Sequence, residues 1–308
     1  MRESGEELTY QTPKTFLRHV SSRPLSFGRF SLPQALRASS LGSREPGSVD
    51  ALPGIKGTAI LDNIRLKLSK TDMHIAFLEG ERFMGFSLSN RLLACAGFVR
   101  PGARVADVGC DHGYLGIHLL KTGRATRVYA SDVRPGPLDC ARRNAVKYGI
   151  GPEITFYLAD GVRGLPRDFD TMICAGMGAD TMISILEAAP WLRDGKYHLI
   201  LQCQSKVPAL RRYASDQGFA ILRETLAEDG KFIYPVMELA YDPGEALTEA
   251  QCWLSPALLA CGCPLLEAYT RRVVGNVRKT VQGLSAAGGP EYQSRARLLR
   301  ELEDLLAQ

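Results

Sequence analysis

Acidic side chains stand near the ends of three consecutive apolar stretches in the first half of the chain. Asp107 lies in RVADV, Asp132 in RVYASDV, and Asp160 ends EITFYLAD. Ligands of open α/β sheets bind outside the carboxyl ends of parallel strands. Carboxylates at such ends can accept hydrogen bonds from an ammonium group, from ribose hydroxyls and from an adenine amino group. We therefore expect a site for an adenosine-containing ligand.

A glycine-containing turn follows the first stretch, in the sequence VADVGCDHGYLGIHLL. It lacks the G-x-G-x-x-G pattern of dinucleotide sites, and Asp111 inside the turn would repel a pyrophosphate. It would not repel the sulfonium and ammonium groups of S-adenosylmethionine, so we expect this cofactor, with a NAD or nucleotide-sugar site as the alternative. The predicted cofactor-binding residues are Asp107, Gly109, Gly113, Asp132, Asp160 and Gly161.

Asp111 and His112 stand side by side in this turn, where small residues are usual. We hypothesise that both are catalytic and lie between a methyl donor and an acceptor base. Asp111 would contact the methionine end of the donor or the developing charge, and His112 would orient Asp111 or bind the base. The alternative is that the His112 ring donates to a backbone carbonyl and holds the loop.

A second glycine loop, AGMGADT, follows the fourth apolar stretch. Gly176 and Gly178 let the backbone approach a ligand closely, and Met177 offers a flexible apolar contact. Arg91, in the first predicted helix, is a candidate phosphate contact. We predict that these four residues bind the substrate.

Strand-like and helix-like stretches alternate from residue 87 onward. Helices are expected at 87–99, 113–123, 137–149, 179–189 and 207–218, and strands at 104–108, 127–133, 153–160, 169–176, 197–203, 219–229 and 231–241. The alternation predicts an α/β fold with a Rossmann-like parallel sheet covered on both faces. The last two strands, joined by a DGK turn, predict a terminal antiparallel hairpin, which favours a class I methyltransferase sheet over a dehydrogenase sheet.

Three segments are expected along the chain. Residues 1–86 are rich in Ser, Pro and Gly without a steady apolar period, so we expect a disordered extension, with Met84 as an alternative start. Residues 87–243 would form the methyltransferase domain. Residues 244–308 would form a small, coiled-coil-like helical domain, because apolar residues recur every three or four positions at 265–284 and 291–306.

The composition sets limits on the partners. The net charge of +5 over 308 residues permits an anionic partner such as RNA without requiring one. No stretch approaches 18 consecutive apolar residues, so we expect no membrane association. The eight cysteines form no CxxC pair. We therefore expect no metal site and a reducing, cytoplasmic setting.

Several blocks, taken in order, resemble the bacterial tRNA (adenine-22-N1)-methyltransferase family, known as TrmK. SNRLLACAGFV resembles the family's opening helix, and VADVGCDHGYL resembles its D-x-G-[ST]-D-H-[AG]-Y-L signature. AGMGADTMISIL resembles its A-G-M-G-G loop, and LRRYASDQGFAILRETLAEDGKFIYPVMEL resembles its last helix and hairpin. The resemblance covers roughly residues 87–285.

The resemblance implies a Rossmann-like methyltransferase domain with C-terminal helices, S-adenosyl-L-methionine as donor, and N1 of adenine 22 in the tRNA D-arm as acceptor. A tRNA partner would be bound mostly through phosphates. The candidate phosphate contacts are Arg91, Arg134, Arg142, Arg143, Arg211, Arg212, Arg271, Arg272, Arg278 and Lys279. Two other functions stay open: a methyltransferase for another RNA or a small molecule, and a non-catalytic protein that binds an adenosine ligand or RNA. The sequence sets no oligomeric state.

Overall fold

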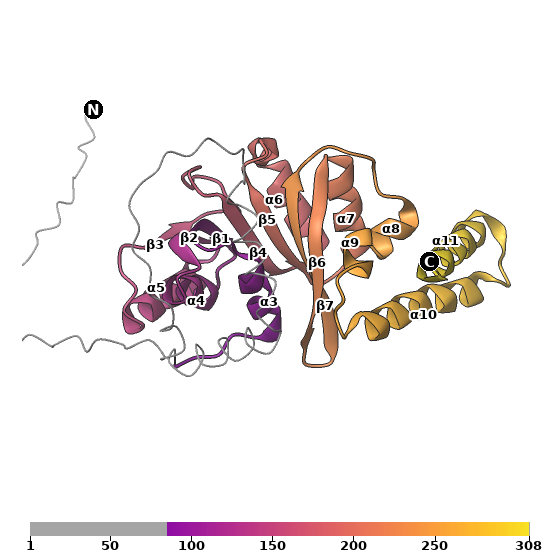
Figure 1. The fold of residues 1–308 in the computed structure, drawn as a ribbon, viewed down its shortest axis with the longest axis horizontal. Coiled ribbons are helices and arrows are strands. Elements are labelled where there is room, and N and C mark those ends of the chain that lie inside the picture. Colours follow the sequence, from indigo (N-terminus) through magenta and orange to yellow (C-terminus); the bar gives the residue numbers. More distant parts are fainter. Residues whose placement is uncertain (1–84, 308) are drawn as a thin grey trace, which may run out of the picture. The chain divides into compact units, whose positions relative to one another are not determined.

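The computed structural model describes residues 85–307, and Figure 1 shows their arrangement. The expected disordered extension, apart from its last two residues, and the alternative start at Met84 lie outside the described residues. The described part contains a seven-stranded sheet with helices on both faces, followed by four further helices.

The strand order places a topological switch in the middle of the sheet. The strands are β1 (Ala103–Val108), β2 (Ala125–Asp132), β3 (Ile154–Leu158), β4 (Thr171–Met177), β5 (His198–Cys203), β6 (Phe219–Asp229) and β7 (Phe232–Tyr241). Their order is β3-β2-β1-β4-β5-β7-β6. The chain winds outward from β1 to β3 and then returns to β4 beside β1, so the crevice expected to bind a ligand lies at the carboxyl ends of β1 and β4.

Strands β1 to β5 are parallel, whereas β7 runs antiparallel between β5 and β6. The predicted Rossmann-like sheet with a terminal antiparallel hairpin is therefore confirmed. The structure adds that β7, the second strand of the hairpin, inserts beside β5, which leaves β6 at the edge.

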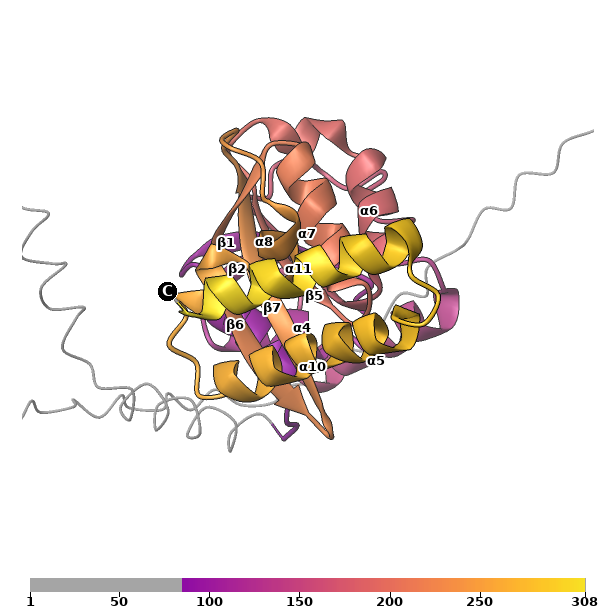
Figure 2. The same cartoon turned by 90° about the vertical axis from the view of Figure 1, so that its right-hand side faces the viewer.

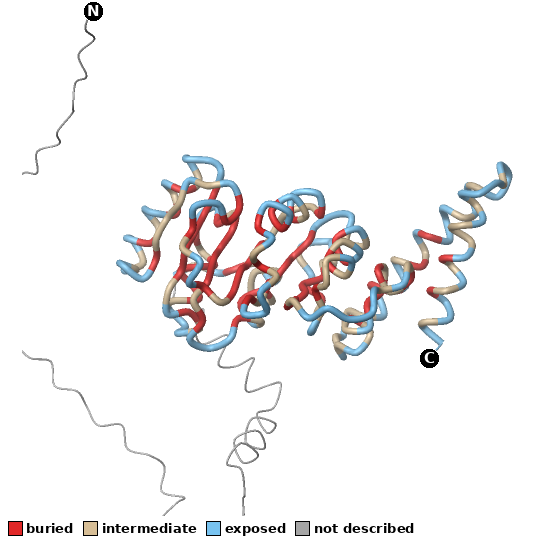
Figure 3. The backbone as a smooth tube through the Cα atoms, turned by 90° about the horizontal axis from the view of Figure 1, so that it is seen from above, coloured by how far each residue is buried: buried red, intermediate tan, exposed pale blue. Residues whose placement is uncertain are grey.

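Alternate side chains of each strand enter two different cores, as the two-residue period of a strand requires. Val105 and Ile173 pack with the helices of one face, and Ala106 and Met172 with those of the other. The first face carries α3 (Asn90–Phe98), α4 (Tyr114–Lys121) and α5 (Pro135–Lys147); the second carries α6 (Ala179–Glu187), the 3-10 helix η2 (Pro190–Arg193) and α7 (Val207–Asp216). Figure 3 shows that the buried residues concentrate along the strands between these layers.

The C-terminal residues form a third core. The helices are α8 (Glu249–Trp253), α9 (Pro256–Leu259), α10 (Leu266–Leu284) and α11 (Gly289–Ala307). Val277 of α10 and Leu298 of α11 are buried in this core, and Leu226 of β6 belongs to the same apolar cluster. Figure 2 shows α10 and α11 side by side, joined by a short connection. The two predicted amphipathic helices are confirmed, whereas the domain boundary at residue 243 stays a prediction.

The short helices α8, α9 and η2 were not predicted from the sequence. They span four or five residues each, which is too short for a helical period to be recognised. Within residues 85–307, no helix combines the length and the apolarity needed to cross a bilayer.

Candidate active site

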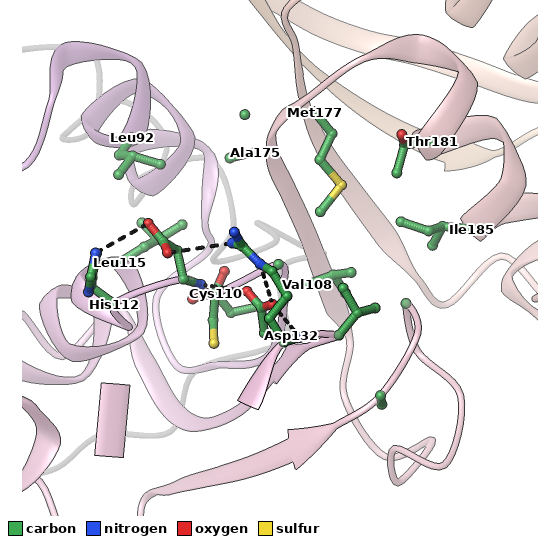
Figure 4. A pocket seen from close by; sticks show the side chains of 18 of the residues that line it. Leu92, Val108, Cys110, His112, Leu115, Asp132, Ala175, Met177, Thr181 and Ile185 are labelled. Carbon is green, nitrogen blue, oxygen red and sulfur yellow. Dashed lines mark hydrogen bonds and ion pairs between the residues drawn. The ribbon is translucent and has the colours of Figure 1, made fainter. Parts of the chain in front are cut away.

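A cavity of about 360 Å³ opens at the carboxyl ends of β1, β2 and β4, where the strand order predicts a ligand crevice. Ten of the twelve predicted site residues line it: Arg91, Asp107, Gly109, Asp111, His112, Asp132, Asp160, Gly161, Gly176 and Met177. Gly113 and Gly178 are not among the lining residues. Figure 4 shows His112, Leu92 and Leu115 on one side of the cavity, Met177, Thr181 and Ile185 on the other, and Asp132 between them.

The turn after β1 has an unusual backbone. Gly109 and Gly113 have φ values of 71° and 73°, and Asp111, between them, has φ 49°. A left-handed conformation costs a non-glycine residue about 1–3 kcal/mol. The backbone N–H of Asp111 donates to Oδ2 of Asp132 at 3.2 Å, which helps to hold this conformation. The turn and the end of β2 are therefore linked through Asp132.

Asp107 is buried at the base of the cavity, and its Oδ2 has no hydrogen-bond partner among the described residues. Burial strongly raises the pKa of this carboxyl group, the N–H of Gly116 lowers it and nearby Asp132 raises it, and the net result is a pKa of about 7. A buried acceptor without a donor is costly. The carboxylate is thus suited to a cationic group entering the cavity.

Asp132 is also buried, at the end of β2. Its Oδ1 accepts a hydrogen bond from the backbone N–H of Arg134 at 2.9 Å, and Nε of Arg134 lies 3.5 Å from the same atom. The Arg134 guanidinium also lies 3.7 Å from Oδ1 of Asp111. Arg134, predicted only as a phosphate contact, therefore lies at the cavity between two of its carboxylates.

Asp160, the third acidic residue, is more exposed to solvent than Asp107 and Asp132. Asp160 is exposed and lies 3.5 Å from Arg163. Gly161, next to it, has φ 63° and packs against Ile185 of α6, and its carbonyl accepts a hydrogen bond from the buried Ser131 hydroxyl at 2.8 Å. The Ser131 contact keeps the end of β3 beside the end of β2.

Two polar side chains hold the carboxyl end of β4. Gly176, with φ 81°, donates its N–H to Oε1 of Gln202 at 3.0 Å. Arg91 of α3 donates to the same oxygen at 3.4 Å, and its Nε pairs with Asp229 at 2.9 Å. Gln202 was missed in the sequence, where it is a single polar residue within the buried strand YHLILQC.

The carboxyl end of β4 also meets the turn after β1. The methyl group of Met177 occupies the place where a Cβ atom on Gly109 would lie. A Cβ atom on Gly178 would lie 2.8 Å from Oγ of Ser205. An alanine at 109 would have to adopt a left-handed backbone and displace the flexible methyl group of Met177, and an alanine at 178 would have to displace the Ser205 hydroxyl.

His112 holds the turn through its backbone. Its carbonyl accepts a hydrogen bond from Nδ2 of Asn144 on α5 at 2.9 Å. Its ring is half exposed, with Nδ1 3.1 Å from Sγ of Cys140 and Nε2 3.8 Å from Oδ2 of Asp111. Cys140 and Asn144 lie four residues apart on one helix face, a spacing that could have singled them out. The predicted alternative, a His112 ring donating to a backbone carbonyl, has no counterpart among the hydrogen bonds of the described residues.

One predicted phosphate contact is wrong. Arg211 is fully buried and pairs with Glu224 at 2.5 Å, and it donates to the carbonyls of Cys252 and Trp253. It therefore cannot reach RNA. The residues 85–307 also contain no group of three or more His, Cys, Asp or Glu side chains arranged to hold a metal ion.

The sequence is similar to those of known methyltransferases. The sequence matches the family described as "Methyltransferase domain" over residues 88–237. It is 33% identical over 146 residues to the tRNA (adenine(22)-N(1))-methyltransferase of Bacillus subtilis (strain 168), an alignment spanning 47% of this chain and 61% of that enzyme. It is 33% identical over 163 residues to a putative tRNA methyltransferase of Mycoplasma pneumoniae, spanning 50% of this chain and 71% of the relative.

A solved structure, shorter than this chain, shares the fold over its whole length. It is a putative tRNA (m1A22) methyltransferase of Streptococcus pneumoniae in complex with S-adenosyl-L-methionine, with a TM-score of 0.60 and 26% identity, covering 71% of this chain and 100% of that one. The fold, the turn with its Asp-His pair and these relatives together show that the chain belongs to the TrmK family of bacterial tRNA (adenine-22-N1)-methyltransferases.

Proposed function

We propose that this chain transfers a methyl group from S-adenosyl-L-methionine to N1 of adenine 22 in the D-arm of tRNA, in the cytoplasm. The observation that carries the proposal is the single cavity into which the predicted acidic residues and both glycine loops converge. The relatives named for this reaction support the choice of donor and acceptor.

The residues at the base of the cavity fit the cofactor. The unpartnered, buried Oδ2 of Asp107 offers an acceptor to the ammonium group, and Asp132 offers acceptors to the ribose hydroxyls. Gly109 and Gly113 shape the turn at the methionine end, and Asp160 with Gly161 would contact the adenine end. S-adenosyl-L-methionine supplies an electrophilic methyl group on a sulfonium.

Asp111 and His112 would act on the acceptor base. N1 of adenine has an in-plane lone pair, so the attack needs no strong general base. The protein must position the base and exclude water. The Asp111 carboxylate would stabilise the positive charge that develops on the adenine, and the adjacent His112 would orient Asp111 or bind the base.

The loop after β4 would form the other side of the base site. Gly176 and Met177 line the cavity, and Met177 offers a flexible apolar surface at its rim, whereas Gly178, next in the chain, is not part of the lining. Arg91, held by Gln202 and Asp229, would contact the phosphates next to the base.

The proposal is tested by incubating the full chain with labelled S-adenosyl-L-methionine and an unmodified tRNA that carries adenine at position 22. Mass spectrometry of the digested RNA then locates any methylated nucleoside. The expected result is 1-methyladenosine at position 22, and a matched tRNA with guanine at that position should gain no label.

A measurement of S-adenosyl-L-methionine binding beside this assay separates the other two functions. Binding of S-adenosyl-L-methionine without transfer to tRNA would contradict the tRNA proposal and indicate another acceptor. Absence of cofactor binding would indicate a non-catalytic protein.

A further inference from the structure

A second cavity lies where the C-terminal helices meet the sheet. Its volume is about 380 Å³, and we call it the hairpin groove because the β6–β7 hairpin forms one wall. Figure 1 shows α10 beside this hairpin. Its lining includes Gln204, Ser205, Lys206, Phe232, Tyr234 and Arg272.

One loop connects the hairpin groove to the active-site cavity. The backbone N–H of Gln204 donates to the carbonyl of Met177 at 2.8 Å, and the carbonyl of Ser205 accepts from the N–H of Ala179 at 3.1 Å. The same two residues, with Lys206, line the groove. The loop between β5 and α7 therefore contacts the segment from Met177 to Ala179 beside the active-site cavity, and it also lines the hairpin groove.

The lining of the groove combines aromatic rings with positive charge. Phe232 and Tyr234 point from the same face of β7, with ring centroids 5.9 Å apart. Arg272 of α10 is exposed, and its Nη2 donates to the carbonyl of Ile233 at 2.7 Å, which fixes the guanidinium at the groove. Lys206 also lines the groove and pairs with Asp180 at 2.6 Å, but no carboxylate is among the lining residues.

Phe232 is an apolar aromatic side chain that is exposed to solvent at the groove. Its exposed fraction is 48%, and it is the one aromatic residue among the large exposed hydrophobic side chains of residues 85–307. Lys231 lies beside it, with Nζ 5.4 Å from the ring centroid. Single-stranded nucleic acids bind to such combinations, because bases stack on exposed rings while cations contact the phosphates.

We propose that the hairpin groove binds a nucleotide flanking the target adenine, by stacking its base on Phe232 and contacting its phosphate with Arg272. The inference rests on the proposed function and extends it, because it names a second contact for the tRNA outside the active-site cavity. A base held in the groove would keep the neighbouring strand unstacked, so that the adenine can enter the active site.

The test measures the affinity of the full chain for unmodified tRNA at one fixed salt concentration. Because base stacking contributes about 1–3 kcal/mol, Phe232→Ala should weaken tRNA binding by about five-fold to about 150-fold. Phe232→Trp, which keeps an aromatic face, should retain the affinity of the wild type. Affinity for S-adenosylhomocysteine and the melting temperature should stay unchanged in both variants.

Leu222→Ala is the matched control. Leu222 lies on β6 of the same hairpin and is 45% exposed, but it does not line the groove. This variant should bind tRNA as the wild type does. Arg272→Gln should reduce the slope of log affinity against log salt by about one, as expected when one phosphate contact is lost.

The outcomes separate the inference from the proposed function. If the wild type neither binds nor methylates tRNA, the proposed function fails. If the wild type is active but Phe232→Ala binds tRNA as tightly as Leu222→Ala, only the groove inference is overturned. If Phe232→Ala instead changes the oligomeric state with tRNA affinity unaltered, the groove seats a protein surface and the inference is again overturned.

Discussion

At the residue scale, Asp107 makes cofactor binding sensitive to pH near neutrality. Burial raises the pKa of its carboxyl group to about 7. An ammonium ligand pairs with the ionised form, and an α-amino group stays mostly charged below about pH 8. We therefore expect the affinity for S-adenosylhomocysteine to rise by up to about eight-fold between about pH 6 and about pH 7.5, measured by isothermal titration calorimetry.

The Asp107→Asn variant provides the control. It should bind the ligand more weakly and show no such rise, because the amide does not titrate. In the unliganded protein, the contribution of Asp107 to the free energy of unfolding should change with pH in the direction opposite to the ligand affinity. Below a pKa of about 7 the folded state keeps a proton that the unfolded state has released, so the contribution of Asp107 to the free energy of unfolding falls as the pH rises from about 4 to about 7. A wild-type affinity that is flat over this range would contradict the assignment of Asp107 to the ammonium group.

His112 allows a catalytic role to be separated from a structural one. Its carbonyl, and not its ring, is held by Asn144, so removing the ring should leave the turn in place. We expect His112→Ala to lower kcat by about ten-fold or more, because the variant loses the group that orients Asp111 or binds the base. The dissociation constant of S-adenosylhomocysteine should change little. Equal losses in kcat and in cofactor affinity would show that the ring only supports the loop.

At the scale of elements, Gly113 sets the packing of α4 against α5. It has φ 73°, and a Cβ atom there would lie 2.9 Å from Cβ of Ala141 on α5. Gly123, after the end of α4, has φ 66° but no atom within 4 Å of such a Cβ. Both alanine variants carry the left-handed backbone cost of about 1–2 kcal/mol, and only Gly113→Ala adds overpacking of about 1–3 kcal/mol.

The expected result is a lower free energy of unfolding for Gly113→Ala than for Gly123→Ala, measured by urea denaturation. Gly113→Ala should also weaken cofactor binding, because a shift of α4 displaces the turn. Similar stability of the two variants would mean that α5 moves away without cost.

At the scale of the whole molecule, a buried ion pair links the sheet to the C-terminal helices. Arg211 of α7 pairs with Glu224 of β6, and Oε2 of Glu224 accepts from the Ser255 hydroxyl at the start of α9. Arg211 also donates to two carbonyls at the end of α8. Removing one partner of a buried pair leaves an uncompensated charge and costs about 3–5 kcal/mol.

We therefore expect Arg211→Leu to lower the free energy of unfolding by about 3–5 kcal/mol, measured in urea. The double variant Arg211→Leu/Glu224→Leu should lose less than the sum of the two single changes. Arg278→Leu, which breaks an exposed pair with Glu303, should cost no more than about 1 kcal/mol. Equal losses for the buried and the exposed pair would contradict the structural role of Arg211.

The alternation of apolar periods was enough to predict most elements. The predicted strand 219–229 coincides with β6, and the predicted helix 265–284 differs from α10 by one residue at its start. The predicted helix ends at Gly123 and Gly149 correspond to left-handed glycines just after α4 and α5. These features depend on local backbone and side-chain preferences, which neighbouring residues in the sequence express directly.

Residues whose role depends on a distant partner were not predictable in this way. Arg211 and Arg212 are adjacent in the sequence, yet Arg211 alone is buried, because Glu224 and the end of α8 meet it in the fold. Gln202 is buried in β5, and its role follows from Gly176 and Arg91, which come from two other elements. No local pattern encodes such pairings.

By itself, the sequence determined the element types, the acids at the strand ends and the resemblance to a methyltransferase family, because periodicity and motif spacing are local properties. Only the tertiary structure decided that β7 lies between β5 and the edge strand β6, that Arg134 lies between Asp111 and Asp132, and that the loop before α7 separates two cavities. These features arise from the packing of segments far apart in the chain, where burial and shape select one arrangement among many that the same local preferences allow.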